Sequence, residues 1–277
     1  MVLDIVTALK NTETKEAPEI KVLIATPCYA GLCHANYTLS LVKTFNYFHQ
    51  IKNVKLAHKF ILHESLVPRA RNFFVAHALS DPTITHLLFV DADMRWEPED
   101  LKKLLSANKP IIAATFPKKK YIWERLRSPV LRQIVMDDQL SPEEFRRKIK
   151  ANLVDYAVNF GPSREVRDGI IEVDHAATAF MLIQRETLEK MCAHYPELKV
   201  KNPAKDLSRE VQEKMYSLFE LTVHDGQYFS EDYQFCKLWN QLGGKVYADL
   251  TINLGHSGAE EYEGNILAVG TLKKDPL

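Results

Sequence analysis

A run of six residues, Thr85-His-Leu-Leu-Phe-Val90, is followed at once by Asp91-Ala92-Asp93. The mostly apolar run predicts a buried strand. Two carboxylates at alternate positions past a strand end can both turn toward one hard cation, and acidic groups beside buried residues are costly without a partner. The alternative is that Asp91 and Asp93 only cap a turn into a helix that we predict to begin near Pro98. The run therefore predicts a strand that ends in a cation site or in a turn.

The first third of the chain contains two further strand patterns with polar loops after them. Lys21–Thr26 predicts a short apolar strand before the turn-rich loop Pro27–Gly31. Lys59–His63 predicts another strand, and an apolar helical stretch then runs to Leu79. Open α/β sheets bind ligands at the carboxyl ends of their strands. We therefore expect ligand contacts in the loops that follow these strands.

Three polar features occupy comparable positions elsewhere. Arg71 falls in the first turn of a predicted helix, where it is poorly placed for the helix dipole but well placed to bind an anion; the alternative is a solvated surface arginine. Glu231 and Asp232 stand just ahead of a helical apolar pattern over 233–241, where the simplest interpretation is a capping pair. His256 follows the predicted strand Lys245–Asn253 and is flanked by glycines, which disfavours a packed core histidine.

These features, in their order along the chain, resemble the GT-A class of nucleotide-sugar glycosyltransferases. The resemblance rests on the first strand and its loop, Ala70-Arg71-Asn72, the D-x-D at 91–93, Glu231-Asp232 and the late His256. It covers 21–258 and is similar in particular to the small soluble glycosyltransferases encoded by chlorella viruses. It implies an α/β fold of the GT-A type, in which a Rossmann-like, mostly parallel sheet is flanked by helices and accompanied by a smaller acceptor-side sheet.

The resemblance also implies a reaction. A sugar would pass from a nucleotide-sugar donor, most readily UDP-glucose or UDP-xylose, to a hydroxyl of a glycan or glycoprotein acceptor with inversion. Asp91, Asp93 and His256 would hold Mn²⁺ or Mg²⁺, which stabilises the departing diphosphate as a Lewis acid. A sugar hydroxyl is too weak an acid to attack unaided, so Asp232 would act as the general base and Glu231 would orient the acceptor.

Further residues are expected to surround the donor. Tyr29 offers a stacking face for the uracil. Lys118 begins a run of three lysines, one of which is expected to reach the donor diphosphate; the alternative is a solvated loop. Asp174 and His175 belong to a segment that resembles the part of GT-A folds under the donor sugar, although a structural histidine is an equal alternative. The full set of expected donor contacts is Thr26, Pro27, Tyr29, Glu64, Arg71, Asp91, Ala92, Asp93, Lys118, Asp174 and His175.

Composition limits the partners. Lys plus Arg and Asp plus Glu number 36 each, which gives no general electrostatic reason to expect nucleic acid or an anionic membrane as a partner. The four cysteines are widely spread without a C-x-x-C pair, as in a reduced cytosolic protein. No stretch reaches the roughly 18 apolar residues that span a bilayer. We expect a soluble protein of the cytoplasm, or of a host cytoplasm if the source is viral, with a homo-oligomer left open.

The predicted organisation is a leader over 1–19 and a single GT-A domain over 20–277. Within that domain, 20–117 is the nucleotide-binding half and 118–277 the acceptor and catalytic half. The charged segment 124–168 predicts an excursion outside the sheet, on the acceptor side or at an oligomer contact. Two other classes stay open: a metal-dependent nucleotidyltransferase, which would normally show a Gly-rich phosphate cradle that is missing here, and a non-catalytic carbohydrate- or nucleotide-sugar-binding protein.

Overall fold

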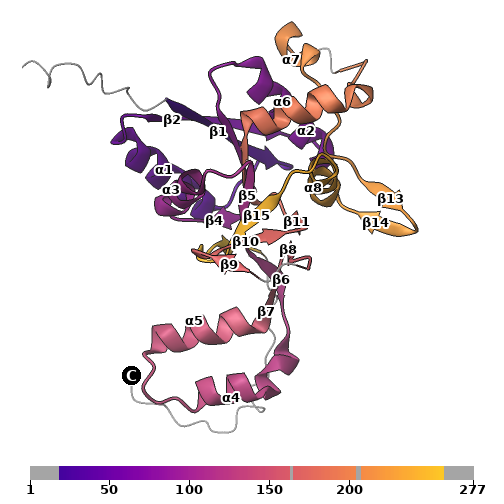
Figure 1. Ribbon diagram of the computed structural model, residues 1–277. Helices are drawn as coiled ribbons and strands as arrows, with labels where there is room; N and C mark the ends of the chain where they lie inside the picture. Colours follow the sequence, from indigo (N-terminus) through magenta and orange to yellow (C-terminus); the bar gives the residue numbers. More distant parts are fainter. Residues whose placement is uncertain (1–18, 163–164, 204–206, 259–277) are drawn as a thin grey trace, which may run out of the picture.

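The computed structural model describes residues 19–162, 165–203 and 207–258, so the predicted leader, except for Glu19, lies outside the described residues. An eight-stranded sheet forms the centre, in the order β2-β1-β3-β12-β5-β15-β10-β9 (Figure 1). Six strands run in one direction, while β10 and β12 run in the other. The predicted α/β class with a mostly parallel sheet is therefore confirmed. The strands are β1 (Ile20–Cys28), β2 (Val54–Leu62), β3 (His86–Val90), β5 (Ile111–Ala114), β9 (Val166–Arg167), β10 (Ile170–Val173), β12 (Phe180–Gln184) and β15 (Val246–Asp249).

Helices cover both faces of the sheet (Figure 1). The helices α2 (Val67–Ser80), α6 (Arg185–His194) and α8 (Glu231–Gln241) pack on one face, and α1 (Ala35–His49) and α3 (Pro98–Ala107) pack on the other. Strand β3 is apolar from Leu87 to Val90 because successive side chains point into opposite helical layers. This explains why the sequence shows a continuous apolar run there rather than an alternating one.

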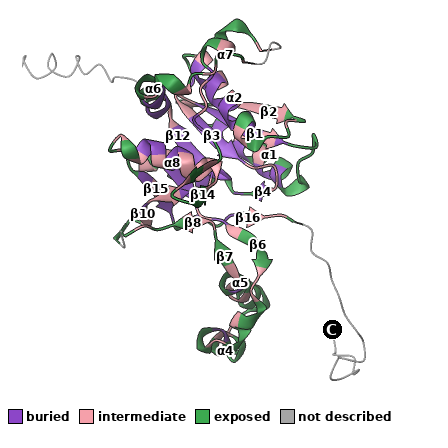
Figure 2. Ribbon diagram, turned by 90° about the vertical axis from the view of Figure 1, so that its right-hand side faces the viewer, coloured by how far each residue is buried: buried purple, intermediate pink, exposed green. Residues whose placement is uncertain are grey.

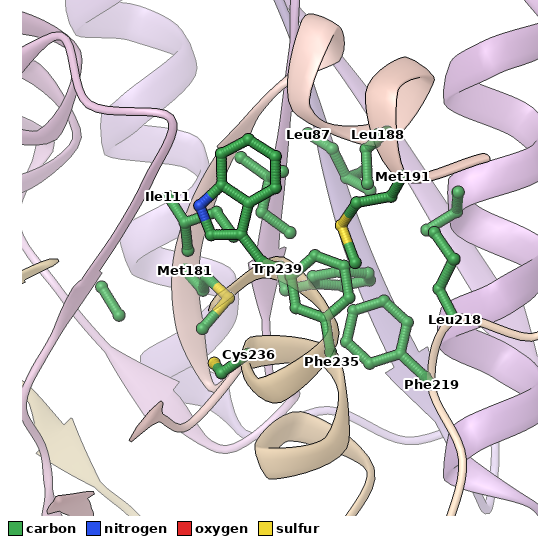
Figure 3. Close-up of a cluster of buried hydrophobic side chains, with 14 of the residues drawn as sticks. Leu87, Ile111, Met181, Leu188, Met191, Leu218, Phe219, Phe235, Cys236 and Trp239 are labelled. Atoms are coloured by element: carbon green, nitrogen blue, oxygen red, sulfur yellow. The ribbon is translucent and has the colours of Figure 1, made fainter. Parts of the chain in front are cut away.

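The core on the α2 face fixes the position of α8 (Figure 3). The rings of Phe219 and Phe235 stack with centroids 4.3 Å apart, and both side chains are fully buried. Trp239, one turn further along α8, donates its indole N–H to the carbonyl oxygen of Lys245 at 3.1 Å. These contacts hold α8 against the sheet, so the first turn of α8 lies at a defined place near the carboxyl end of β3.

An extension of the chain projects from the sheet, and we call residues 117–156 the arm (Figures 1 and 2). Strands β6 (Pro117–Tyr121) and β7 (Val154–Tyr156) form its stalk, and η1 (Trp123–Arg127), α4 (Pro129–Val135) and α5 (Pro142–Leu153) form its end. Its side chains are mostly exposed, with Leu131 and Leu153 buried between the helices. The predicted excursion outside the sheet over 124–168 is confirmed for 124–156, whereas 166–167 form β9 at the edge of the sheet. Helix α5 is capped by Ser141, which forms a capping box with Glu144.

Three short antiparallel pairs complete the fold beside the sheet. Strands β4 (Met94–Arg95) and β16 (Gly255–His256) pair with one another, as do β8 (Val158–Asn159) with β11 (His175–Ala176) and β13 (Thr222–His224) with β14 (Gln227–Phe229). Short helices η2 (Pro196–Leu198) and α7 (Arg209–Glu213) follow α6. Because β4 begins directly after Asp93, its pairing with β16 brings His256 next to the D-x-D.

Some predicted boundaries were wrong. The strand expected to reach Asn253 ends at Asp249, whose Oδ1 accepts hydrogen bonds from the amide and hydroxyl of Thr251, both at 2.7 Å, and so turns the chain. Helix α8 includes Glu231 and Asp232 in its first turn instead of following them. In the part of the chain that the structure describes, no helix is long and apolar enough to cross a membrane. All four cysteines are free.

Candidate active site

Arg71 connects the two acidic motifs. Its side chain is only 5% exposed, its Nη2 lies 3.2 Å from Asp91 Oδ1, and its Nε lies 3.4 Å from Glu231 Oε1. The guanidinium carbon also lies 5.3 Å from the centre of the Phe89 ring. Burial alone would lower the pKa of Arg71, but Asp91, Glu231 and Asp232 outweigh burial and raise it. A permanently charged guanidinium therefore fixes the D-x-D relative to the start of α8.

Asp93 faces His256. Nδ1 of His256 lies 2.8 Å from the carbonyl oxygen of Pro117, and a carbonyl can only accept, so Nδ1 donates its hydrogen there. In a neutral imidazole the lone pair then lies on Nε2, which is 3.5 Å from Asp93 Oδ1, longer than an ordinary hydrogen bond. Metal-binding histidines usually have this arrangement, with one nitrogen donating to a carbonyl and the other free to bind the ion.

The second oxygen of Asp93 has a different partner. Lys119 of β6 donates to Asp93 Oδ2, and its side chain is 39% exposed while that of Asp93 is 24% exposed. Burial alone would raise the pKa of Asp93, but the charged form of His256, in which Nε2 carries a hydrogen, and Lys119 outweigh burial and lower the pKa to about 2. The carboxylate is therefore ionised at neutral pH and has a cationic partner on one oxygen only.

Three buried polar atoms at this edge have no hydrogen-bond partner. Across the described residues, the buried unpaired side-chain atoms are Arg71 Nη1, Asp93 Oδ1 and Thr178 Oγ1. Thr178 precedes Ala179, whose carbonyl oxygen accepts from the amide of Asp91 at 3.1 Å, so all three belong to the surroundings of the D-x-D. Buried polar groups are nearly always paired, and an unpaired one costs about 1–3 kcal/mol. Their concentration at one place indicates a site built for a polar ligand.

The predicted metal ligands are only partly assembled. The structure brings Asp93 and His256 together, whereas Asp91 turns toward Arg71. Among the described residues, no group of three or more His, Cys, Asp or Glu side chains is arranged to hold a metal ion. The available donors still fit a divalent cation: two carboxylates, and an imidazole whose Nδ1 hydrogen bond leaves Nε2 facing Asp93. Binding of Mn²⁺ or Mg²⁺ therefore stays a prediction.

The loop after β1 contributes less through side chains than its sequence indicated. The hydroxyl of Thr26 hydrogen-bonds to Tyr37, and the whole residue is buried within β1, so the structure leaves no surface of Thr26 for the predicted donor contact. Pro27 is half-buried within β1, while the Tyr29 side chain is 71% exposed and free to contact a base. Within the D-x-D, the carbonyl oxygen of Ala92 accepts from the amide of His34 at 2.9 Å. This bond joins the end of this loop to the D-x-D.

Glu64 has a partner that the sequence analysis did not assign to it. Both of its oxygens lie 2.7 Å from guanidinium nitrogens of Arg69, and Oε1 also accepts from the amide of Leu66 at 2.9 Å. Hydrogen bonds from Arg69 are the main reason that the pKa of Glu64 is lowered. A ribose hydroxyl would have to compete with Arg69 for this carboxylate.

The base candidate Asp232 lies in the first turn of α8. Its Oδ1 accepts from the hydroxyl of Ser230 and from the amide of Tyr233 at 2.9 Å. Within the described ranges, Oδ2 makes no hydrogen bond or ion pair. One oxygen thus orients the carboxylate, and the other is left to accept a proton.

His175 lies beside this carboxylate. Its ring stacks on that of Tyr233, with centroids 4.4 Å apart and planes at 12°. Burial lowers the pKa of His175, and the nearby charges of Asp174 and Asp232 oppose that shift. The carbonyl oxygen of Asp174 accepts from the side-chain amide of Asn240 at 3.0 Å. The structure thus places His175 next to the first turn of α8, whereas Asp174 is bound through its backbone to Asn240 near the end of that helix.

Sequence reasoning missed three residues of this region. Lys119, rather than the exposed Lys118, contacts the D-x-D, because Lys119 lies on the side of β6 that faces β4 and β16. The sequence analysis did not single out Thr178, and it included Tyr233 only as part of the apolar pattern over 233–241. The run of three lysines after a buried strand was the sole sequence feature that pointed to Lys119.

Comparisons with known proteins give remote likenesses. No protein-family model matches the chain, and no curated protein matches it. Among solved structures, the chain is similar to A197 from STIV, with a TM-score of 0.45 and 14% identity over 87% of each chain. It is also similar to 4-diphosphocytidyl-2C-methyl-D-erythritol synthase from Anaerococcus prevotii, with a TM-score of 0.34 and 13% identity over 68% of this chain and 79% of that one. These likenesses are too remote to bear on function, which depends on the residues of the site.

Proposed function

We propose that this chain is a metal-dependent glycosyltransferase of the GT-A type, which transfers a sugar from a UDP-sugar to a hydroxyl of a glycan or glycoprotein. The observation that carries the proposal is the group of buried unpaired atoms on Arg71, Asp93 and Thr178 around the D-x-D. A buried edge with both cationic and anionic unpaired atoms matches a ligand that is itself both anionic and metal-bound. A nucleotide sugar with a divalent ion has this character.

Asp93 and His256 are the residues that would hold the ion, joined by Asp91 through Oδ2, the oxygen that Arg71 does not contact. A divalent ion, when bound, supplies Lewis-acid stabilisation of the negative charge on the leaving diphosphate. Arg71 remains charged in the buried floor of the site, and its Nη1 is unpaired. Arg71 would therefore bind an anionic oxygen of the donor through Nη1 while still holding Asp91 and Glu231.

Asp232 supports an inverting mechanism. Its orienting hydrogen bonds go to Oδ1, which leaves Oδ2 to accept the proton of the acceptor hydroxyl as the oxygen attacks the anomeric carbon. Glu231, held by Arg71, lies next to it and would orient the acceptor. His175 and Tyr233 form a stacked pair beside this carboxylate and offer a flat surface for a sugar ring.

The reaction products test the proposal. Purified protein is incubated with a panel of UDP-sugars, including UDP-glucose and UDP-xylose, in Mn²⁺ or in chelator, and release of UDP and free sugar is measured. The proposal predicts Mn²⁺-dependent release of UDP from at least one donor. A nucleotidyltransferase would instead make pyrophosphate from a nucleoside triphosphate and a sugar phosphate. A binding protein would retain the UDP-sugar intact.

A further inference from the structure

Lys119 forms an ion pair with Asp93, one of the proposed metal ligands. Its ammonium contacts Asp93 Oδ2 from β6, while Asp93 Oδ1 faces Nε2 of His256. The backbone at Gly258 lies close to the stem of Lys119, since a Cβ added there would be 2.9 Å from its Cδ. Lys119 is thus positioned on Asp93 by packing as well as by charge.

An ammonium on Oδ2 of Asp93 and a divalent cation on Oδ1 of the same carboxylate would repel each other. Binding of the ion to Asp93 therefore favours departure of Lys119. A cavity of about 270 Å³ lies beside Lys119 and is lined also by Trp123 and His256. The flexible four-carbon stem of lysine lets the ammonium move into this space, where it would be free to bind an anionic group of the donor.

We propose that Lys119 is the counter-ion of Asp93 in the metal-free chain and passes to the donor diphosphate when the metal binds. This inference rests on the proposed function, because it concerns the same metal site. The consequence is that metal binding and diphosphate binding are coupled. Without nucleotide, the metal has to displace Lys119 and so binds weakly. With a nucleoside diphosphate present, the displaced ammonium binds the diphosphate, and the metal binds more tightly. By linkage, the metal strengthens diphosphate binding by the same factor.

The test compares the wild-type chain with Lys119→Met, which removes the charge and keeps the apolar stem. Mn²⁺ affinity is measured by electron paramagnetic resonance of free Mn²⁺, first without nucleotide and then with saturating UDP. We expect Lys119→Met to bind Mn²⁺ alone about fivefold more tightly, as for loss of a competing, partly exposed ion pair. We expect it to bind UDP in saturating Mn²⁺ more weakly than wild type.

Lys102→Met is the control. Lys102 lies on α3, is exposed, does not line the cavity beside Lys119, and has no charged partner among the residues with described positions. Both of its affinities should equal those of wild type, and circular dichroism should show the same fold for all three proteins.

The pair of opposite changes distinguishes this role from a structural one. A variant weakened toward both Mn²⁺ and UDP would overturn the inference and make Lys119 a structural residue. Equal Mn²⁺ affinities for Lys119→Met and wild type would overturn it while leaving the metal-dependent function intact. If neither protein binds Mn²⁺ with or without UDP, the inference and the proposed function fail together.

Discussion

Asp91 and Glu231 bind the same guanidinium, although one follows the central strand β3 and the other begins α8. Arg71 Nη2 lies 3.2 Å from Asp91 and Arg71 Nε lies 3.4 Å from Glu231. A buried arginine between two carboxylates fixes their separation, because moving either one would leave charge unpaired. The motif expected to bind the donor and the motif expected to activate the acceptor are therefore parts of one charged network.

Removal of this arginine should destabilise the chain. In Arg71→Met the carboxylates of Asp91 and Glu231 lose their shared partner, and the free energy of unfolding should fall by about 3 kcal/mol, as for one-sided loss of a buried pair. Urea denaturation followed by circular dichroism measures the change. Affinity for UDP should also fall.

The neighbouring Arg69 provides a control for the stability effect. Arg69 makes two hydrogen bonds of 2.7 Å to Glu64, shorter than the contacts of Arg71, but its side chain is 53% exposed. Arg69→Met should therefore lose no more than about 1 kcal/mol. Equal losses in the two variants would contradict the central position that we assign to Arg71.

Removal of the unpaired hydroxyl of Thr178 should affect donor affinity and protein stability in different ways. Valine has the same shape without the hydroxyl, so Thr178→Val should be as stable as wild type or about 1 kcal/mol more stable. If the hydroxyl serves the donor, the affinity for the UDP-sugar should fall about tenfold, equivalent to about 1.4 kcal/mol. Thermal unfolding and calorimetry measure the two quantities. Unchanged donor affinity would exclude Thr178 from the site.

Two half-buried histidines predict how stability depends on pH. Burial lowers the pKa of His58 and of His77 to about 4, with Lys59 adding to the effect at His77. Between about pH 6.5 and 4 the unfolded chain binds protons at these positions that the folded chain does not. The free energy of unfolding should therefore be highest above pH 6.5 and should fall as the pH drops toward 4.

His77→Gln tests this pH dependence. The variant removes one titrating group, so its stability should fall less steeply between pH 6.5 and 4, by up to about 1.4 kcal/mol per pH unit. Above pH 7, His77 is unprotonated in both the folded and the unfolded chain. The stability of wild type and the stability of His77→Gln should therefore change with pH in parallel there. Identical slopes in the acidic range would show that His77 does not contribute to the linkage.

Asp232 should affect turnover more than binding. Asp232→Asn keeps the Oδ1 acceptor for Ser230 but cannot accept a proton, so turnover should fall about a hundredfold to ten-thousandfold with UDP-sugar affinity retained. Proton NMR of the fresh wild-type product should show the anomeric configuration opposite to that of the donor. Retention of configuration would remove Asp232 from the role of base.

The sequence predicted the sheet better than it predicted the contacts of the site. The apolar runs of β1, β3 and β5 give parallel strands because both of their faces are covered by helices. The placement of Asp91, Arg71 and Glu231 at one edge followed from the order of strands and loops. The class of fold was therefore accessible from local patterns.

Pairings between distant segments were not accessible in this way. Lys119 reaches Asp93 because β6 lies beside β16, which pairs with β4, and no local pattern encodes that arrangement. The same holds for the unpaired hydroxyl of Thr178, since burial and a missing partner are properties of the folded chain. Strand β15 ends early because the side chain of Asp249 accepts a hydrogen bond from the amide of Thr251. The prediction followed the apolar pattern and therefore extended the strand to Asn253.

Calorimetric titration of UDP into the protein, in Mn²⁺ and in chelator, tests the central claim most directly. Wild-type protein should bind UDP in Mn²⁺ and lose most of that affinity in chelator. Asp93→Asn should lose the Mn²⁺ dependence while keeping the wild-type circular dichroism spectrum. UDP binding of equal strength in Mn²⁺ and in chelator, or in wild type and Asp93→Asn, would contradict a metal-dependent nucleotide-sugar site at the end of β3.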